Sequence, residues 1–470
     1  MVLKVVIVGG GIAGLSAAIA MRRVGHNVSI YEQSSFSNEV GAAVTISPNA
    51  ARLLLAWGIE PITNQFTLAN GIGISVGATK ARVDFAPLGE MVGKLFGKPF
   101  YFAHRVDLHE ALRKLAIGEE GAGKPAVLHL NSRIESYDPE AALITLRTGE
   151  VVQGDIVIAA DGVHSLAIEY VLGRPNPAKP QELYNGCYRF LIPASELDAD
   201  PETQWWNAEH LNDGHMRIFM NGKTGNRLVS YPCKLNKLWN CVGMFNSCGD
   251  VNFGTREDWH KPVDKAQLLS SYADFHSSII AVLKKARDIK RWPLLYRGPI
   301  PTWSKGYLVL VGDAAHPMLP HQGQGAPQGI EDAIALGLVL STASHEAIPA
   351  RLAAFDKIRR ARASALQIMS NAGLDQQDIV QEELSKYLDV IPKSRQEFAQ
   401  FSWGHDVVRE TVKVMREMFD DEFSVPEGFF VADPHCPEVV MPPCDMVNGQ
   451  GQNGQVQDAH LQHNGNEQNV

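Results

Sequence analysis

The fold of this 470-residue chain is decided by the stretch VVIVGGGIAG at residues 5–14. Its apolar half predicts a buried strand, and the apolar residues that follow it predict a helix. Between them, Gly9, Gly11 and Gly14 have the spacing of a turn that presents backbone N–H groups and a helix N-terminus to a pyrophosphate. The stretch therefore predicts a Rossmann-like α/β domain that binds a dinucleotide.

A second apolar run at residues 28–31 ends at Glu32. An acidic residue after the second strand of such a unit accepts hydrogen bonds from ribose hydroxyls and repels a 2′-phosphate. Glu32 therefore favours FAD or NAD over NADP at this site.

The stretch GDAAHPMLP at residues 312–320 distinguishes between these two dinucleotides. It follows a predicted buried strand at residues 307–311. Gly312 allows a tight turn directly after that strand. The carboxylate of Asp313 then lies at the end of the strand, where it can accept a hydrogen bond from a polyol hydroxyl. FAD has a ribitol and NAD has none, so the pattern indicates FAD and argues against an NAD dehydrogenase.

Four stretches resemble class A flavoprotein monooxygenases of the aromatic hydroxylase superfamily, particularly the salicylate hydroxylase-like and fungal FAD-dependent members. They are the glycine motif with Glu32, HRVDL at 104–108, DGVHS at 161–165, and the segment from Gly312-Asp313 to EDA at 331–333. Together they cover roughly residues 3 to 370. The resemblance implies FAD as cofactor, NADPH or NADH as co-substrate, and Arg105 as a residue that meets the flavin.

The expected fold class is α/β, with a Rossmann-like FAD-binding domain of the glutathione reductase type, an inserted β-sheet substrate domain and C-terminal helices. The FAD-binding domain is expected to be discontinuous, at residues 1–75, 100–170 and 290–370. Residues 76–99 and 171–289 are assigned to the substrate sheet, because short alternating runs with turn signals recur there. Residues 371–430 are expected to be helical, and 431–470 to form a disordered tail.

The cofactor site is expected to draw on several parts of the chain. The loop at 41–44 is placed beside the isoalloxazine, Pro320 at one wall of the pocket, and the helix that begins at 323–326 with its N–H groups toward the flavin N1/O2 edge. The expected cofactor-binding residues are Gly9, Gly11, Gly14, Glu32, Ala43, Arg105, Asp161, Gly162, Asp313, Pro320, Gly325 and Ala326.

Oxygen transfer from a flavin C4a-hydroperoxide, which the resemblance implies, requires a dry site and an electron-rich substrate such as a phenolate. Arg189 and Tyr231 lie on predicted strands of the substrate sheet and are the expected catalytic residues, because a cation or a phenol near the substrate oxygen lowers its pKa. The alternatives are that Arg189 is a salt-bridged strand residue and Tyr231 packs in the core. His316 is expected to be structural, and His321 is the next candidate base.

Two departures from the family pattern bear on cofactor contacts. The DG motif usually continues with an arginine three residues past the serine, but Leu166-Ala167-Ile168 follow Ser165 here. We therefore expect different contacts to NAD(P)H. Ala43 stands where a glycine is common, so the loop should be slightly less open.

Charge and composition exclude other classes of protein. A net charge of −9 argues against nucleic-acid binding. Cysteines without CxxC pairing are typical of reduced intracellular thiols, so a cytoplasmic protein is expected. We expect neither a membrane span nor a metal site, the histidines of the tail included, and a monomer or homodimer.

The sequence therefore predicts an NAD(P)H-dependent FAD monooxygenase that hydroxylates a phenolic or similarly electron-rich ring. Decarboxylation or dearomatisation can accompany such a reaction, in secondary metabolism or in aromatic catabolism. The alternative enzyme acts on a non-phenolic natural product by epoxidation, indole oxidation or Baeyer–Villiger insertion. A flavin-binding protein without turnover is a more remote alternative.

Overall fold

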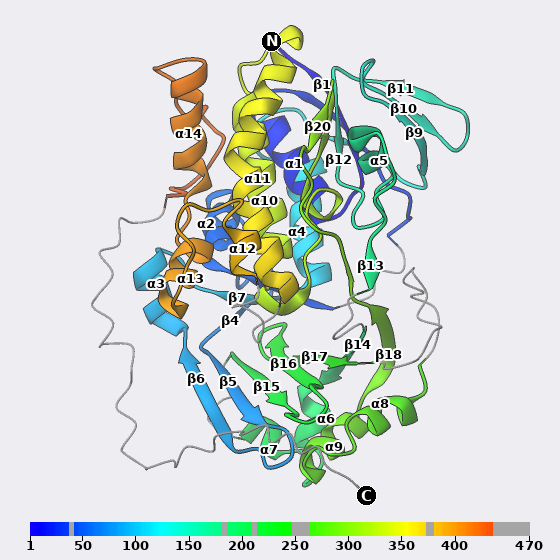
Figure 1. Ribbon diagram of the computed structural model, residues 1–470, viewed down its shortest axis with the longest axis vertical. Coiled ribbons are helices and arrows are strands. Elements are labelled where there is room, and N and C mark those ends of the chain that lie inside the picture. Colours follow the sequence, from blue (N-terminus) through cyan, green and yellow to red (C-terminus); the bar gives the residue numbers. More distant parts are fainter. Residues whose placement is uncertain (37–41, 181–185, 209–213, 247–262, 373–379, 436–470) are drawn as a thin grey trace, which may run out of the picture. The chain divides into compact units, whose positions relative to one another are not determined.

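The computed structural model describes residues 1–36, 42–180, 186–208, 214–246, 263–372 and 380–435. Its central element is a six-stranded sheet of order β20-β21-β12-β1-β2-β8 (Figure 1). The strands are β1 (Lys4–Val8), β2 (Asn27–Tyr31), β8 (Val127–His129), β12 (Ile156–Ala159), β20 (Ser304–Lys305) and β21 (Leu308–Leu310). Neighbours pair in parallel except β20 and β21. The parallel sheet predicted from the glycine turn is therefore present.

The register of this sheet brings the functional motifs to one edge. Val8 lies opposite Tyr31 on one side and Ala159 on the other, and Ala159 lies opposite Leu310. Because parallel strands end at the same edge, the residues that follow them emerge side by side. The glycine turn, Glu32, the DG motif and the GD motif thus share the carboxyl edge, where ligands of such sheets bind.

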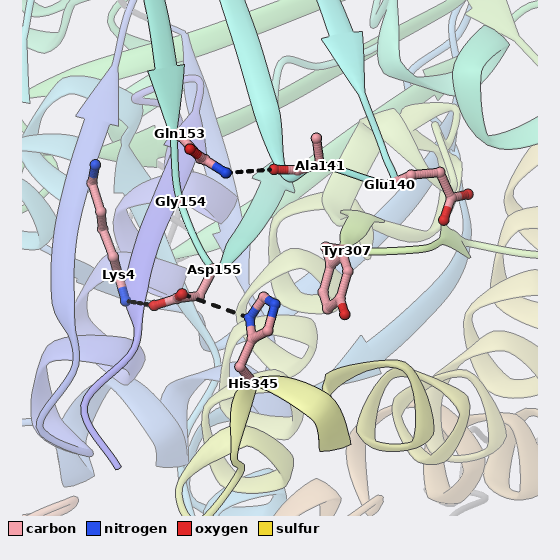
Figure 2. A pocket seen from close by; sticks show the side chains of 8 residues that line it. All are labelled: Lys4, Glu140, Ala141, Gln153, Gly154, Asp155, Tyr307 and His345. Carbon is pink, nitrogen blue, oxygen red and sulfur yellow. Dashed lines mark hydrogen bonds and ion pairs between the residues drawn. The ribbon is translucent and has the colours of Figure 1, made fainter.

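A polar hollow of about 400 Å³ lies at the opposite edge (Figure 2). Its lining includes Lys4 at the start of β1, whose backbone N–H donates to the Asp155 carboxylate at 2.6 Å. The rings of Tyr307 and His345 stack at 4.6 Å beside it. Because this is the amino edge of the parallel strands, we do not assign the cofactor to it.

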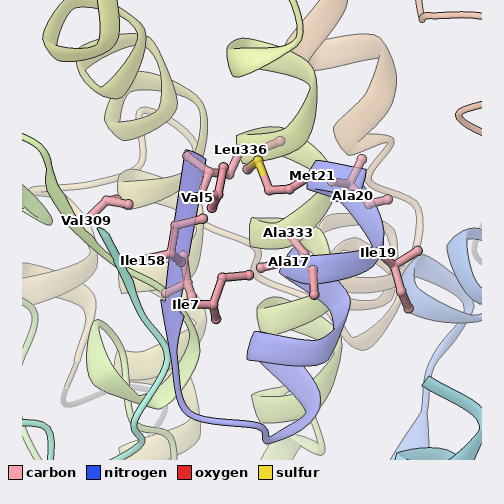
Figure 3. Close-up of a cluster of buried hydrophobic side chains, with 14 of the residues drawn as sticks. Val5, Ile7, Ala17, Ile19, Ala20, Met21, Ile158, Val309, Ala333 and Leu336 are labelled. Carbon is pink, nitrogen blue, oxygen red and sulfur yellow. The ribbon is translucent and has the colours of Figure 1, made fainter. Parts of the chain in front are cut away.

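The core of the nucleotide-binding part is built by α1 (Ile12–Arg23), α10 (Gly325–Leu340) and the strands beside them. Side chains of β1, α1 and α10 meet in one apolar cluster (Figure 3). Glycines allow the helices to approach closely, since a Cβ atom on Gly337 would lie 2.7 Å from the Cβ of Ala20. Also in this part are α4 (Arg105–Ile117), α5 (Ala167–Leu172) and α11 (Ile348–Ala372).

Smaller sheets and helices complete this part of the molecule. One three-stranded sheet has the order β3-β7-β4, another the order β11-β10-β9, and β13 pairs with β19. The bounds are β3 (Ala43–Ile46), β4 (Thr67–Leu68), β7 (Tyr101–His104), β9 (Ile134–Asp138), β10 (Leu143–Leu146), β11 (Val151–Gln153), β13 (Lys179–Pro180), β19 (Leu295–Tyr296), α2 (Pro48–Ala56) and α3 (Gly89–Phe96). Short 3-10 turns are η1 (Gly312–Ala314), η2 (Pro320–Gln322) and η3 (His345–Ala347).

A seven-stranded sheet of order β18-β14-β17-β16-β15-β5-β6 forms the second large element. Its strands are β5 (Gly71–Val76), β6 (Arg82–Pro87), β14 (Gly186–Pro193), β15 (His215–Met220), β16 (Arg227–Cys233), β17 (Leu238–Phe245) and β18 (Arg287–Pro293). Neighbours are antiparallel except β15 and β5. Strands β14 to β17 fall within residues 171–289 and β6 falls within residues 76–99, the two ranges assigned to the substrate sheet, and β5 and β18 extend the same sheet.

The two faces of this sheet have different partners. The back face carries Tyr188, Phe190 and Trp239, which pack with α6 (Ala194–Asp198), α8 (Lys265–Ser271) and α9 (Ser277–Lys284). α7 (Trp205–Ala208) lies in the same layer through Trp206. The residues that alternate with the back-face residues along each strand form the front face of the sheet. This face packs against β3, β7 and the loop after the GD motif. The front face therefore meets the nucleotide-binding part.

Two range boundaries differ from the sequence-based expectation. The seven-stranded sheet already begins at Gly71, inside the range 1–75 expected for the FAD-binding domain. At the other end, the range 371–430 contains α12 (Gln381–Leu384), α13 (Arg395–Trp403) and α14 (Val407–Met418). The chain then remains ordered past residue 430, because the Val431 N–H donates to the Ala56 carbonyl at 2.8 Å. The rest of the expected tail, from residue 436, lies outside the described residues.

Candidate cofactor and substrate site

The glycine turn leaves room for a ligand at the carboxyl edge. Gly9 has φ +101°, in the left-handed region that favours glycine, and a Cβ on Gly14 would lie 2.0 Å from the Gly9 carbonyl oxygen. A Cβ on Gly11 would instead meet no described atom within 4 Å. No side chain of the described residues caps the start of α1. The first N–H groups of this helix are thus available to a pyrophosphate.

Glu32 lies beside this turn and holds it in place. One carboxylate oxygen accepts from the Gly10 N–H at 2.7 Å and the other from the Ser34 N–H at 2.7 Å. His109, on α4, contacts the Gly10 carbonyl through Nε2 at 2.7 Å, so this nitrogen must carry the proton. The sequence pattern gave no signal for His109, because it approaches from a helix that no motif links to the turn.

The DG motif follows β12 at the same edge. The Tyr137 hydroxyl donates to the Asp161 carboxylate at 2.9 Å. Burial raises the pKa of Asp161, while hydrogen bonds from Ser165 and Tyr137 lower it. Gly162 has φ +82°, and a Cβ there would meet no described atom within 4 Å. The motif thus presents a polar group and open space beside the glycine turn.

Asp313 follows β21 and is exposed, yet desolvation by the surrounding protein raises the pKa of its carboxyl. Nearby positive groups, Arg297 and Arg105 among them, oppose the rise in pKa. The Asp313 carboxyl therefore lies near positive groups at the carboxyl edge of the six-stranded sheet, directly after β21.

Arg297 is a buried residue that the sequence analysis missed. Its guanidinium donates to the backbone carbonyls of Asp313 at 3.0 Å and Ala314 at 3.3 Å. Desolvation lowers the pKa of Arg297, and the charges of Asp313 and Asp161 raise it. A positive charge thus lies close to both the DG and the GD motif. It comes from Arg297 and not from residues 166–168, where the family pattern usually has an arginine.

The helix expected at 323–326 begins at Gly325, and the side chain of its N-cap residue, Gln324, makes no capping hydrogen bond. A Cβ on Gly325 would lie 4.0 Å from the Asp313 carboxylate, so this helix start adjoins the GD motif. Pro320 and His321 lie in η2 just before it. His316 is fully buried, with its Nε2 2.7 Å from the Asp332 carboxylate, in the structural position that the sequence predicted.

Arg189 and Tyr231 both lie on the front face of the seven-stranded sheet. Arg189 is opposite Val242 on β17, Val242 is opposite Val229, and Tyr231 is two residues further along β16. The Arg189 guanidinium lies 4.9 Å from the Trp292 ring, and no described carboxylate forms an ion pair with it. The alternative of a salt-bridged strand residue thus finds no partner within the described ranges.

Tyr231 is more constrained than the sequence suggested. Its hydroxyl donates to the Ala43 carbonyl at 2.8 Å, and its ring lies 4.8 Å from that of Phe102. Burial raises the pKa of Tyr231 well above its ordinary value, and the charge of Arg189 lowers it in part. Tyr231 is therefore a buried neutral phenol near Arg189.

Comparison with known proteins agrees with this geometry. The family model described as "FAD binding domain" matches residues 2–370. The chain is 41% identical over 430 residues to the FAD-dependent monooxygenase cfoG of Aspergillus candidus. The aligned region covers 91% of this chain and 98% of that relative. It is 31% identical over 431 residues to hispidin-3-hydroxylase of Neonothopanus nambi, covering 88% and 97% respectively. The structure of CtdE in complex with FAD and substrate 4 has the same fold, with 20% identity, a TM-score of 0.73 and coverage of 88% and 98%.

The chain therefore belongs to the FAD-binding-domain family and is a class A FAD-dependent monooxygenase of the aromatic hydroxylase superfamily. This confirms the predicted fold class and FAD as the cofactor. Among the described residues, no helix is long and apolar enough to span a membrane.

Proposed function

We propose that this protein hydroxylates a phenolic or similarly electron-rich aromatic small molecule with NAD(P)H and O₂. The balanced reaction converts the aromatic C–H, O₂, NAD(P)H and a proton into the aromatic C–OH, NAD(P)⁺ and water. FAD, when bound, supplies the two-electron chemistry with the nicotinamide and the activation of oxygen. The residues of the chain bind the cofactor, exclude water and hold the substrate.

The observation that carries this proposal is the Arg189 guanidinium on the front face of the sheet, where apolar side chains lie beside it. Arg189 shares the front face with Val229, Val242 and Met244, which pack with Leu319 from the loop after the GD motif. A guanidinium in such surroundings stabilises a phenolate and lowers the pKa of the phenol. The apolar neighbours accommodate an aromatic ring and exclude water.

Binding of FAD is assigned to the carboxyl edge of the six-stranded sheet. The turn containing Gly9, Gly11 and Gly14 would hold the pyrophosphate, Glu32 the adenosine ribose and Asp313 the ribitol. The remaining assigned residues would line the flavin or the pyrophosphate: Ala43, Arg105, Asp161, Gly162, Pro320, Gly325 and Ala326. The uncapped start of α10 supports its assignment to the flavin edge that becomes negative on reduction.

The names of relatives support an aromatic substrate. 3-Hydroxybenzoate 6-hydroxylase 1 of Aquipseudomonas alcaligenes, 29% identical to this chain over 385 residues, is named for hydroxylation of a hydroxybenzoate, which is a phenol, and hispidin-3-hydroxylase is named for hydroxylation of hispidin. The cfoG protein is named only as an FAD-dependent monooxygenase. We therefore propose an aromatic natural product or catabolite of the phenol class.

A screen of the purified flavoprotein tests this function. NADPH or NADH oxidation would be followed with a panel of phenols, each paired with its O-methyl ether as matched control, and products would be identified by mass. We expect a phenol to accelerate NAD(P)H oxidation and to gain 16 Da, the mass of one oxygen atom, while its ether reacts poorly. Equal turnover of phenols and ethers would contradict a phenolate-based reaction.

A further inference from the structure

Both polar groups of the Ala43 peptide backbone are bound by side chains of the seven-stranded sheet. The Ala43 N–H donates to the Asn240 side-chain oxygen at 3.0 Å. The Tyr231 hydroxyl donates to the Ala43 carbonyl at 2.8 Å. Asn240 and Tyr231 lie directly opposite each other on β17 and β16, so their side chains project from the same face of the sheet.

These side chains replace a missing strand neighbour. β3 is the outer strand of the order β3-β7-β4, so its free edge would need another strand or water to satisfy its backbone groups. Asn240 and Ala43 are both buried, which excludes water as the ordinary partner. Since a backbone N–H can only donate, the oxygen of Asn240 must face Ala43.

The contacts continue from Ala43 toward the start of α10. The Thr45 hydroxyl, two residues along β3, donates to the Gly323 carbonyl at 2.9 Å. The approach is close, because a Cβ on Gly323 would lie 2.3 Å from the Thr45 hydroxyl oxygen. β3 thus connects the front face of the sheet to the loop that leads into α10.

We infer that Tyr231 and Asn240 form a positioning pair that fixes β3, and with it the Ala42-Ala43 segment that is assigned to the flavin, at a set separation from the front face of the sheet. This inference rests on the proposed function, because Arg189 lies on that same face. It also changes the role of Tyr231. Its proton is held by Ala43, so Tyr231 acts through the backbone and leaves substrate activation to Arg189.

Loss of the pair should permit a competing reaction. When substrate and flavin are misplaced, the enzyme converts NAD(P)H, a proton and O₂ into NAD(P)⁺ and hydrogen peroxide, and the aromatic ring stays unchanged. Losing one net hydrogen bond changes such a partition by about two- to tenfold. Because the residues share one partner, their effects should not multiply in the double variant.

The test compares holoenzyme variants Tyr231→Phe, Asn240→Leu and the double variant with Ser230→Ala. Ser230 is the matched control: it is a buried hydroxyl on the same strand, but it faces Cys241 on the back face. Two readouts are taken, the visible circular dichroism of the bound flavin and the hydrogen peroxide released per NADPH. The first requires no turnover, so it decides the inference even if no aromatic substrate is oxidised.

We expect Tyr231→Phe and Asn240→Leu to change the flavin dichroism and to raise peroxide release about two- to tenfold, with the double variant close to the larger single effect. Ser230→Ala should match the wild type. Wild-type dichroism and coupling in Tyr231→Phe and Asn240→Leu would overturn the inference. If Asn240→Leu does not fold, Tyr231→Phe decides alone, because it removes only a hydroxyl.

Discussion

Side chains on either side of the glycine turn fix its backbone. Glu32 accepts from the Gly10 N–H, and His109 donates to the Gly10 carbonyl. The turn is therefore held in shape by the protein itself, which lowers the entropy lost when a dinucleotide binds. Glu32 has a double role, since it supports the turn and keeps lone pairs for a ribose.

Removing either of the acidic groups assigned to FAD should weaken its binding. Glu32→Ala and Asp313→Ala each lose charge-assisted hydrogen bonds worth ~1.5 to 3 kcal/mol, so FAD should bind roughly ten- to hundredfold more weakly. Equilibrium dialysis followed by flavin absorbance measures this. Full flavin occupancy in both variants would contradict the assigned cofactor contacts.

Arg189 should affect oxygen transfer more than flavin binding. Losing one electrostatic contact to the developing oxyanion typically lowers the rate about a hundred- to a thousandfold, so Arg189→Ala should hydroxylate that much more slowly. Flavin absorbance should stay unchanged and peroxide per NADPH should rise. Arg287→Ala is the control, because it removes an exposed arginine of β18 on the same sheet. Wild-type coupling in Arg189→Ala would show that Arg189 is structural.

Helices α10 and α11 are joined by a buried ionic cluster. Glu331 accepts from Arg359 at 2.5 Å and from Arg362 at 2.9 Å, and Asp332 accepts from Arg359 at 2.9 Å. Burial alone would raise the pKa of Glu331. The two guanidinium groups nevertheless hold the pKa well below its ordinary value. This cluster holds α10, and hence its uncapped start, against the rest of the protein.

Breaking this cluster should destabilise the protein strongly. Arg359→Met removes the guanidinium that the two buried carboxylates share, leaving Glu331 with Arg362 and Asp332 with His316, and breaking a buried pair in this way typically costs about 3–5 kcal/mol. The melting temperature should therefore fall clearly, whereas Arg360→Ala, which removes a partly exposed pair with Asp356, should change it little. Equal melting temperatures in the two variants would contradict this role.

The same cluster predicts how wild-type stability depends on pH. Because the folded pKa of Glu331 lies below the unfolded value of 4.5, its contribution is fully present above that value and is lost as pH falls through the folded pKa. Denaturant titrations below pH 4.5 should show this loss in the wild type. Arg359→Met should show a shallower dependence, and an unchanged pH slope would contradict the assignment.

Local signals allowed one part of the site to be predicted. The glycine turn, Glu32 and the GD motif follow their strands directly, so short stretches of sequence place them. His109 and Asn240 could not be found this way, because their partners Gly10 and Ala43 lie 99 and 197 residues away along the chain. Arg189 and Tyr231 were assigned to predicted strands, but only the register shows that they share a face.

For the molecule as a whole, the C-terminal segment should be dispensable. Residues 448–470 are nearly all Asn, Gln, Gly and His, with little apolar surface to bury. Deleting them should leave the melting temperature, flavin content and turnover unchanged. Truncation at residue 430 is the informative contrast, because it removes the backbone bond between Val431 and Ala56. A lower melting temperature for the shorter deletion would contradict this prediction.

The proposed function requires that one atom of O₂ enters an aromatic substrate for each NAD(P)H that is oxidised without release of peroxide. The most direct measurement supplies ¹⁸O₂ to the holoenzyme with a phenol that the screen identifies and determines the product mass by mass spectrometry. We expect a product that carries one ¹⁸O atom, in amounts matching NAD(P)H oxidised minus peroxide released. A product that takes its oxygen from water, or NAD(P)H oxidation that yields only peroxide with every aromatic, would contradict it.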